Sequence, residues 1–150
     1  MKGCIFCDIV SGKSPSHKIW EDASHFAFLS IFPNTEGFSV ITTKRHYPSY
    51  AFDLPEKVFR DLAVAAKKVG KLLDKKLENV GRTGMILEGF GVDHVHAKLF
   101  PMHGTKMGKW KPFRSGIDKF FEKYEGYISS HDHKRADDKK LAKLARKIKE

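Results

Sequence analysis

The heptapeptide His94-Val95-His96-Ala97-Lys98-Leu99-Phe100 alternates nitrogen-bearing and apolar side chains until its last residue. Side chains on a β-strand point to opposite faces with a period of two, so this pattern predicts a strand with two unlike faces. The apolar members would enter a hydrophobic core. The two histidines and the lysine would line the other face as a row of nitrogen groups on a rigid support.

Two neutral imidazoles beside an ammonium group suit an anionic substrate. One ring can act as a nucleophile, the other as a ligand or an orienting group, and the ammonium can balance the charge of a phosphate. A histidine pair on a strand is also compatible with a partly exposed surface. The spacing therefore makes this row a candidate site without assigning a role to each ring.

The chain has two cysteines, Cys4 and Cys7, and their C-x-x-C spacing lets both sulfur atoms reach one tetrahedral zinc ion. A structural zinc site needs two further ligands, and the chain offers eight histidines. Among them, His46 follows an apolar run typical of a strand, and His94 opens the heptapeptide. Two reduced thiols or a redox pair are the alternatives, and the spacing does not choose among them.

Together these residues resemble the histidine-triad (HIT) superfamily of nucleotide hydrolases and transferases, especially its small, zinc-containing bacterial branch. The resemblance covers about residues 4–103 in the family's order. Its motifs are C-I-F-C-D-I-V-S-G-K-S-P (4–15), I-W-E-D (19–22), A-F-L-S-I-F-P (27–33), the stretch 37–46, F-D-L-P (52–55) and the heptapeptide.

The resemblance implies that Cys4, Cys7, His46 and His94 bind a structural zinc ion and that His96 is the catalytic nucleophile. In the family this imidazole attacks the α-phosphorus of a nucleotide and forms a covalent nucleotidyl-histidine, which water or another acceptor resolves. The residue type agrees, because a neutral imidazole is a competent nucleophile and an intermediate divides one difficult displacement into two. Small members of the family are commonly homodimers, so a homodimer is also implied.

The chain departs from the family pattern at two polar positions. Lys98 stands where the family has its third histidine, near the scissile phosphate and its leaving oxygen. A lysine can stabilise developing charge, but near neutral pH it gives up a proton far less readily than an imidazolium does. Ser30 stands where many members have an aspartate that holds the ribose hydroxyls. We retain Lys98 as a catalytic residue and Ser30 as a nucleotide-binding residue.

The loop Leu87–Asp93 is shorter than the family's loop and lacks its Asn and its Gly-Gln pair. Gly89 and Gly91 are candidates for close backbone contact with a phosphate, although two glycines in a turn are more often ordinary turn residues. After the heptapeptide, aromatic rings alternate with cations, which makes His103 and Trp110 further candidates for nucleotide binding. His103 is also a candidate for proton transfer. An exposed basic loop is the alternative for this segment, and we favour it.

Length and charge limit the domain organisation and the partners. The 150 residues suffice for one domain, which we place at residues 1–130, followed by a basic helical tail at 131–150. The formal net charge of +10 suggests nucleic acid, but residues 134–150 alone carry eight basic and three acidic side chains, a difference of +5. Nucleic acid is therefore possible as a partner but not favoured.

The tail has the pattern of an amphipathic helix. Its apolar residues recur at the spacing of one helical face, which predicts packing on the domain or on a partner subunit; they are Leu141, Leu144, Ala145 and Ile148.

The chain has no apolar run of the roughly 20 residues that span a bilayer, no signal-peptide pattern and only two cysteines. We therefore expect a cytoplasmic protein with no membrane partner.

The remaining patterns predict an α+β fold: an antiparallel sheet with one long central helix, plus the C-terminal amphipathic helix. Strands are expected at 26–31, 38–43, 84–88 and 94–100, with 127–130 as a weaker candidate, and a short helix at 117–124. Asp53 and Glu56 resemble a capping box that opens the long helix, which ends before Gly81. Its expected buried face consists of Phe59, Leu62, Ala63, Ala66, Val69, Leu73 and Leu77.

These patterns and the resemblance together predict an enzyme that cleaves at the α-phosphate of a purine nucleotide derivative through a nucleotidyl-His96 intermediate. By resemblance, its substrates are dinucleoside polyphosphates, nucleoside phosphoramidates or adenylates. One alternative is a nucleotide-binding regulatory protein with weak or no turnover, which the substitutions at Lys98 and Ser30 and the short loop suggest. Another is a hydrolase of adenylated nucleic-acid ends, which the basic excess suggests.

Overall fold

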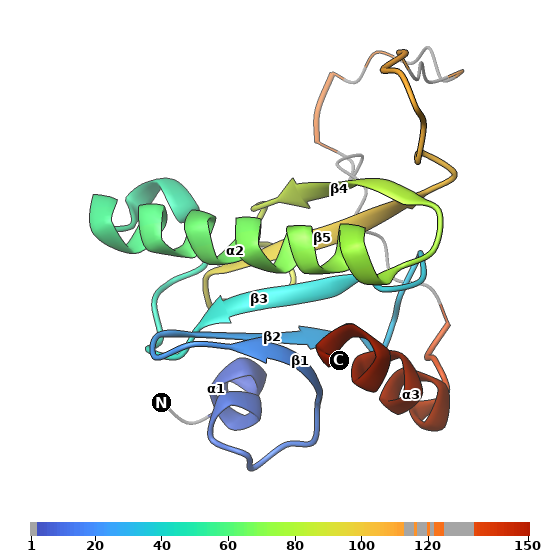
Figure 1. Ribbon diagram of the computed structural model, residues 1–150. Coiled ribbons are helices and arrows are strands. Elements are labelled where there is room, and N and C mark those ends of the chain that lie inside the picture. The colour runs from blue at the N-terminus through green and yellow to red at the C-terminus, as the bar shows by residue number, and fades with distance from the viewer. Residues whose placement is uncertain (1–2, 113–115, 117–119, 121, 125–133) are drawn as a thin grey trace.

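Across the part of the chain that the structure describes, five antiparallel strands form one sheet and three α-helices flank it (Figure 1). This computed structural model describes residues 3–112, 116, 120, 122–124 and 134–150. The strand order is β1-β2-β3-β5-β4. The strands are β1 (His17–Glu21), β2 (His25–Leu29), β3 (Ser39–Thr43), β4 (Val80–Ile86) and β5 (His96–His103). The helices are α1 (Ile5–Val10), α2 (Glu56–Lys76) and α3 (Asp138–Lys149), with a 3-10 helix, η1 (Ala51–Asp53), before α2.

The predicted α+β fold with an antiparallel sheet and one long helix is confirmed. In the heptapeptide, Val95, Ala97 and Leu99 belong to the main hydrophobic core, as their alternation predicts. The strand itself begins at His96 and pairs with β3, where Thr42 lies opposite His96 and Ser39 opposite Leu99. The nitrogen-bearing residues of the heptapeptide therefore face away from that core.

The long helix α2 covers the core face of the sheet. Leu62, Val69 and Leu73 are fully buried, as the helical spacing predicts, and each such side chain contributes roughly 1.5–3 kcal/mol by leaving water. Ala65 is also buried, although the pattern does not single it out. Because this helix and the sheet close around one another, the core side of β5 is rigid.

The predicted start of α2 is wrong. Pro55, not Asp53, occupies the N-cap position, and no side chain caps the helix. Asp53 belongs to η1, and Leu54, which follows it, is extended with φ −69° and ψ 147°. A residue that precedes proline is driven into this extended conformation, so Leu54 separates Asp53 from the helix.

The opposite face of the sheet carries a second, aromatic cluster, which we call the aromatic face. It consists of Phe6 from α1 with Phe26, Phe28, Phe38 and Val40 from the strands and their ends. Alternate residues of β2 divide between the two faces, since Ala27 and Leu29 belong to the main core. Helix α1, which the sequence patterns did not predict, covers the aromatic face next to β5.

The C-terminal helix α3 packs on the sheet beside β1 (Figure 1). Leu141, Ala145 and Ile148, three of the four predicted apolar residues, are buried in the main core, and the fourth packs against it. Asp137 caps the helix by accepting a hydrogen bond from the Lys140 amide at 2.9 Å.

Not every predicted boundary falls within the described residues. The weak strand candidate at 127–130 lies outside them, and so does half of the short helix predicted at 117–124. Strand β1 was not predicted at all, and β4 starts four residues earlier than predicted, at Val80 rather than Gly84.

Among the described residues, no helix combines the length and the apolar character that a bilayer crossing requires.

Candidate functional site

Four potential metal-binding atoms from three segments of the chain meet beside α1. Cys4 precedes α1, Cys7 lies within it, His46 follows β3 and His94 precedes β5. The Cys4 Sγ lies 3.4 Å from the His94 Nδ1, and the Cys7 Sγ lies 3.5 Å from the His46 Nδ1 and 3.6 Å from the His94 Nδ1. All four donor atoms lie within 4.8 Å of one another.

This donor set fits a tetrahedral zinc ion. With Zn–S bonds of about 2.3 Å and Zn–N bonds of about 2.0–2.1 Å, the edge between a sulfur and a nitrogen ligand is about 3.5 Å, close to the three separations above. On its other side, the His94 ring donates from Nε2 to the Thr43 carbonyl at 2.9 Å, which leaves the Nδ1 lone pair directed at the sulfurs. Burial lowers the pKa of His94, so the ring is held neutral, as a metal ligand must be.

His96 lies two residues further along, at the start of β5, and is only 3% exposed. Its Nδ1 donates to the His94 carbonyl at 2.7 Å, so the lone pair of the neutral ring is on Nε2. The edge-to-face ring of Phe6, 5.0 Å away between centroids, fixes the ring's orientation from α1. Burial lowers the pKa of His96, and the charge of Lys98 lowers it further. The result is a neutral imidazole with one oriented, unprotonated nitrogen.

Lys98 is paired with an acidic residue that the sequence analysis missed. Its Nζ donates to Glu88 Oε1, and the two side chains are only 13% and 6% exposed. The second oxygen of Glu88 accepts a hydrogen bond from the Phe90 amide at 2.8 Å. The only sequence signal was a single acidic residue in the M-I-L-E-G stretch (85–89), which begins in the last two residues of β4. Its partner depends on the register between β4 and β5, where Ile86 lies opposite Lys98.

The two glycines of the short loop occupy different surroundings. Gly89 has φ +73°, and a Cβ on it would lie 2.8 Å from the Ser49 carbonyl oxygen, so the close approach of the two segments requires glycine there. A Cβ on Gly91 would lie 3.9 Å from Lys98 Nζ. The Ser49 amide in turn donates to Asp93 at 2.9 Å, which ties the loop to the segment that carries His46.

The other candidate nucleotide-binding residues do not gather at His96. Ser30 is half-buried after β2 and accepts a hydrogen bond from the Phe32 amide at 3.1 Å; with Phe38 it lines a pocket of about 420 Å³ beside α3. His103 ends β5, seven residues or roughly 23 Å along the strand from His96, and bonds to the Glu36 carbonyl. Trp110 is 69% exposed. The structure therefore does not bring His103 within proton-transfer reach of His96.

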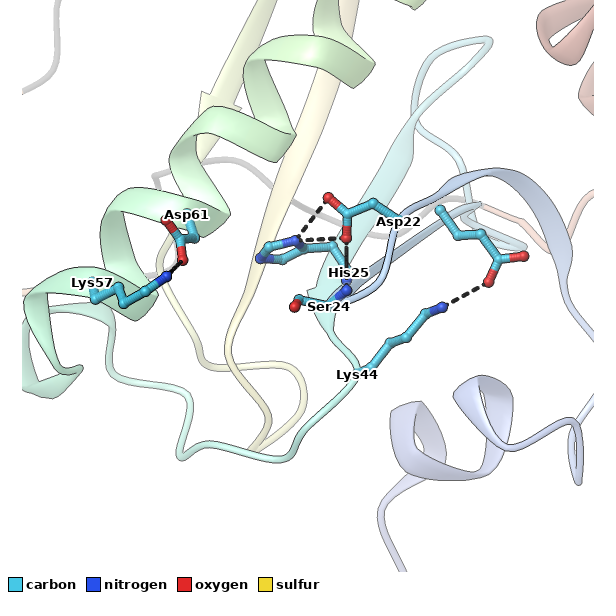
Figure 2. Close-up of polar contacts among 7 residues, drawn as sticks. Asp22, Ser24, His25, Lys44, Lys57 and Asp61 are labelled. Atoms are coloured by element: carbon cyan, nitrogen blue, oxygen red, sulfur yellow. Dashed lines mark hydrogen bonds and ion pairs between the residues drawn. The ribbon is translucent and has the colours of Figure 1, made fainter.

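A separate polar cluster surrounds His25 on the α2 side of the sheet (Figure 2). His25 is only 4% exposed, and its Nδ1 donates to Asp22 at 3.0 Å. Asp22 also accepts hydrogen bonds from the amides of Ser24 and His25 at 2.8 and 2.7 Å, which closes the turn between β1 and β2. Figure 2 shows Lys57 paired with Asp61 on α2 nearby. His25 is the first residue of β2 and is a buried part of this cluster.

The chain belongs to the HIT family. The family model described as "HIT domain" matches residues 11–105. The chain is 33% identical over 119 residues to an adenosine 5'-monophosphoramidase of Saccharomyces cerevisiae, with 77% of this chain and 75% of the relative covered. It is 35% identical over 106 residues to the Schizosaccharomyces pombe protein of the same name, with 70% and 78% covered. These named relatives support a hydrolase.

Solved structures agree with the fold. A zinc-bound histidine triad family protein from Mycobacterium smegmatis superposes with a TM-score of 0.69 at 20% identity, covering 98% of this chain and 91% of its own. A protein from Streptococcus mutans, SMU.412c, gives a TM-score of 0.64 at 27% identity, covering 99% and 84%. The similarity extends along nearly the whole chain in both cases.

Proposed function

We propose that this protein is a nucleotide hydrolase or nucleotidyl transferase that cleaves at the α-phosphate of a purine nucleotide derivative. Dinucleoside polyphosphates, nucleoside phosphoramidates and adenylates are the candidate substrates. The observation that carries the proposal is the state of His96: a buried neutral ring whose Nδ1 proton is held by the His94 carbonyl. That hydrogen bond leaves Nε2 as the nucleophile.

The proposed reaction has two displacements. Nε2 of His96 attacks the α-phosphorus, an N–P bond forms, and the bond from phosphorus to the leaving group breaks with its electron pair going to the leaving group. Water or another acceptor then attacks phosphorus, and the N–P bond breaks with its electron pair returning to Nε2. The Nδ1 hydrogen bond to the His94 carbonyl stabilises the positive charge that the ring bears in between. Lys98 offsets the charge that develops on the phosphate.

Nucleotide contacts are proposed for Ser30, Gly89, Gly91, His103 and Trp110, in addition to the two catalytic residues. Ser30 lines a pocket beside α3 that does not include His96, so its proposed role rests on the resemblance. The geometry at His103 gives no support to the proton-transfer role, so we do not assign it one.

We propose that the metal cluster holds a structural zinc ion through Cys4, Cys7, His46 and His94. A zinc ion there would join α1 to the segments before β5 and after β3, and so fix the strand that carries the nucleophile. Elemental analysis should find about one zinc per chain. The double variant Cys4→Ser, Cys7→Ser should lose it, and zinc content that survives this change would contradict the assignment.

The homodimer and the cytoplasmic location stay predictions. For the homodimer, β4 is the natural candidate surface, because it is an edge strand whose Met85 is 48% exposed beside Met102 at 44%. Light scattering on the purified protein tests it. A monomer mass at micromolar concentration would contradict the dimer.

The test of the catalytic proposal is product analysis with the wild type and His96→Ala. Both proteins are incubated with diadenosine tetraphosphate, adenosine phosphoramidate and an aminoacyl adenylate analogue, and released AMP or ATP is measured. His17→Ala is the matched control, because this histidine lies on β1, which two strands separate from β5. Turnover by the wild type and the control, but not by His96→Ala, is expected. Full turnover by His96→Ala would refute the nucleophile.

The alternative of a regulatory nucleotide-binding protein is favoured by one observation, the pairing of Lys98 with Glu88. A cation that is engaged by a carboxylate is less available to a phosphate. Tight nucleotide binding without product, in the same incubations, would favour this alternative.

A further inference from the structure

The Lys98 ammonium is the charged group nearest in sequence to His96, the proposed nucleophile. Lys98 follows His96 by two residues on β5, so both side chains leave the same face of the sheet, roughly 7 Å apart at their origins. Lys98 therefore lies on the same side of the sheet as the ring that would attack the phosphorus.

Glu88 holds this ammonium in an ion pair that is shielded from water. The side chain of Glu88 is 6% exposed and that of Lys98 is 13% exposed, and the carboxylate is itself fixed by the Phe90 amide at 2.8 Å. Opposite charges that are buried together attract each other strongly, because little water screens them. The pair therefore holds the Lys98 ammonium in a defined position.

Leaving groups differ in whether they need a proton. A carboxylate or a polyphosphate departs with the electron pair of the broken P–O bond and is stable as an anion. An alkylamine must receive a proton as the P–N bond breaks, because its anion is far too basic to depart. A histidine near neutral pH supplies such a proton well, whereas an ion-paired ammonium mainly supplies charge.

We propose that the Glu88–Lys98 pair makes this protein selective for adenylates with acidic leaving groups, acyl adenylates and dinucleoside polyphosphates, over phosphoramidates of alkylamines. The proposal rests on the function proposed above and names its substrate class. In the favoured reaction, Nε2 of His96 forms the N–P bond while the P–O bond breaks, and the carboxylate or phosphate leaves unprotonated beside Lys98. Water then cleaves the N–P bond, gives AMP and loses a proton to solvent. Lys98 contacts the leaving group, and Glu88 is a positioning residue.

The experiment compares kcat/KM for acetyl adenylate with kcat/KM for an N-alkyl phosphoramidate of AMP, in the wild type and in Lys98→His. Because a positioned proton donor is worth about 10²- to 10⁴-fold, the ratio of the two constants should fall at least 100-fold in Lys98→His, mainly through faster phosphoramidate cleavage. Lys98→Met is the control without a charge or a proton and should lose kcat on both substrates. An equal ratio in the wild type and Lys98→His would overturn the proposal.

A second comparison tests whether Glu88 acts through Lys98. Glu88→Gln should lower kcat for acetyl adenylate with little change in KM, and Glu88→Asp should restore part of the loss. In the Lys98→Met background, Glu88→Gln should have no further effect on kcat. An equal loss in both backgrounds would show a structural role and would overturn the positioning role. Near-ultraviolet circular dichroism confirms that each variant is folded.

The two proposals fail in different ways. Cleavage of both substrates by the wild type with similar kcat/KM refutes the selectivity and leaves the function proposed for His96 intact. Cleavage of neither substrate refutes the proposed function and the selectivity with it.

Discussion

Truncation of one buried residue on α3 tests whether the C-terminal helix belongs to the core of its own chain. Ile148 is 0% exposed and lies in the main core cluster. Ile148→Ala removes three carbon atoms, which at about 0.8 kcal/mol for each buried methylene amounts to roughly 2.4 kcal/mol. The cavity that remains raises the expected loss to about 3–4 kcal/mol, within the range of about 2–5 kcal/mol for such truncations. Lys149→Ala, an exposed change on the same helix, should cost less than about 0.5 kcal/mol.

The assay is urea unfolding at neutral pH, followed by far-ultraviolet circular dichroism, with the free energy of unfolding extrapolated to water for the wild type and both variants. A loss below about 1 kcal/mol in Ile148→Ala, equal to that in Lys149→Ala, would falsify the docking of α3 on its own sheet. A loss that appears only in dilute samples would instead indicate that the helix is buried between subunits.

Two further changes test local features. Asp22→Asn removes a carboxylate whose folded pKa is lowered, against the opposing effect of its burial, by the amides of Ser24 and His25 and by the His25 ring. A lowered folded pKa stabilises the protein at neutral pH and is lost as the pH falls through that value, below about 4. Asp22→Asn should therefore be less stable than the wild type at pH 7. Between pH 7 and pH 3 its stability should fall less than that of the wild type. The midpoint of urea unfolding, measured for both proteins at each pH, checks this. Gly89→Ala should cost more than Gly104→Ala in thermal unfolding: both have positive φ, at +73° and +79°, but only the first Cβ would meet a neighbour, at 2.8 Å. Equal losses would show that packing on the Ser49 carbonyl is unimportant.

Local periodicity was sufficient for the elements that pack by one face. The alternation in the heptapeptide predicts a strand, and the helical spacing from Leu62 to Leu73 predicts α2 with its buried side. The same holds for α3, whose apolar stripe is buried as expected. In each case the pattern reports directly which side chains leave water, and burial of those side chains stabilises the element.

Local signals failed where a neighbouring residue or a short element decided the outcome. The capping box at Asp53 is broken by Pro55, which restricts the backbone of Leu54. Helix α1 has only six residues, too few for a periodic pattern, although it carries Cys7 and places Phe6 against His96. The buried His25 is bonded to Asp22, and no spacing in the sequence indicates this pair.

For the candidate site, too, some features follow from the sequence and others only from the tertiary structure. The sequence by itself determined the chemistry that is available: two thiols, a row of two histidines and a lysine, and a resemblance that assigns them roles. Tertiary structure alone brought Cys7 within 3.5 Å of a histidine 39 residues away and paired Lys98 with Glu88. The physical reason is cooperative. All the cross-strand contacts together set the register of β4 against β5, and all the packing contacts together set the position of α1 on the aromatic face. No short segment encodes them.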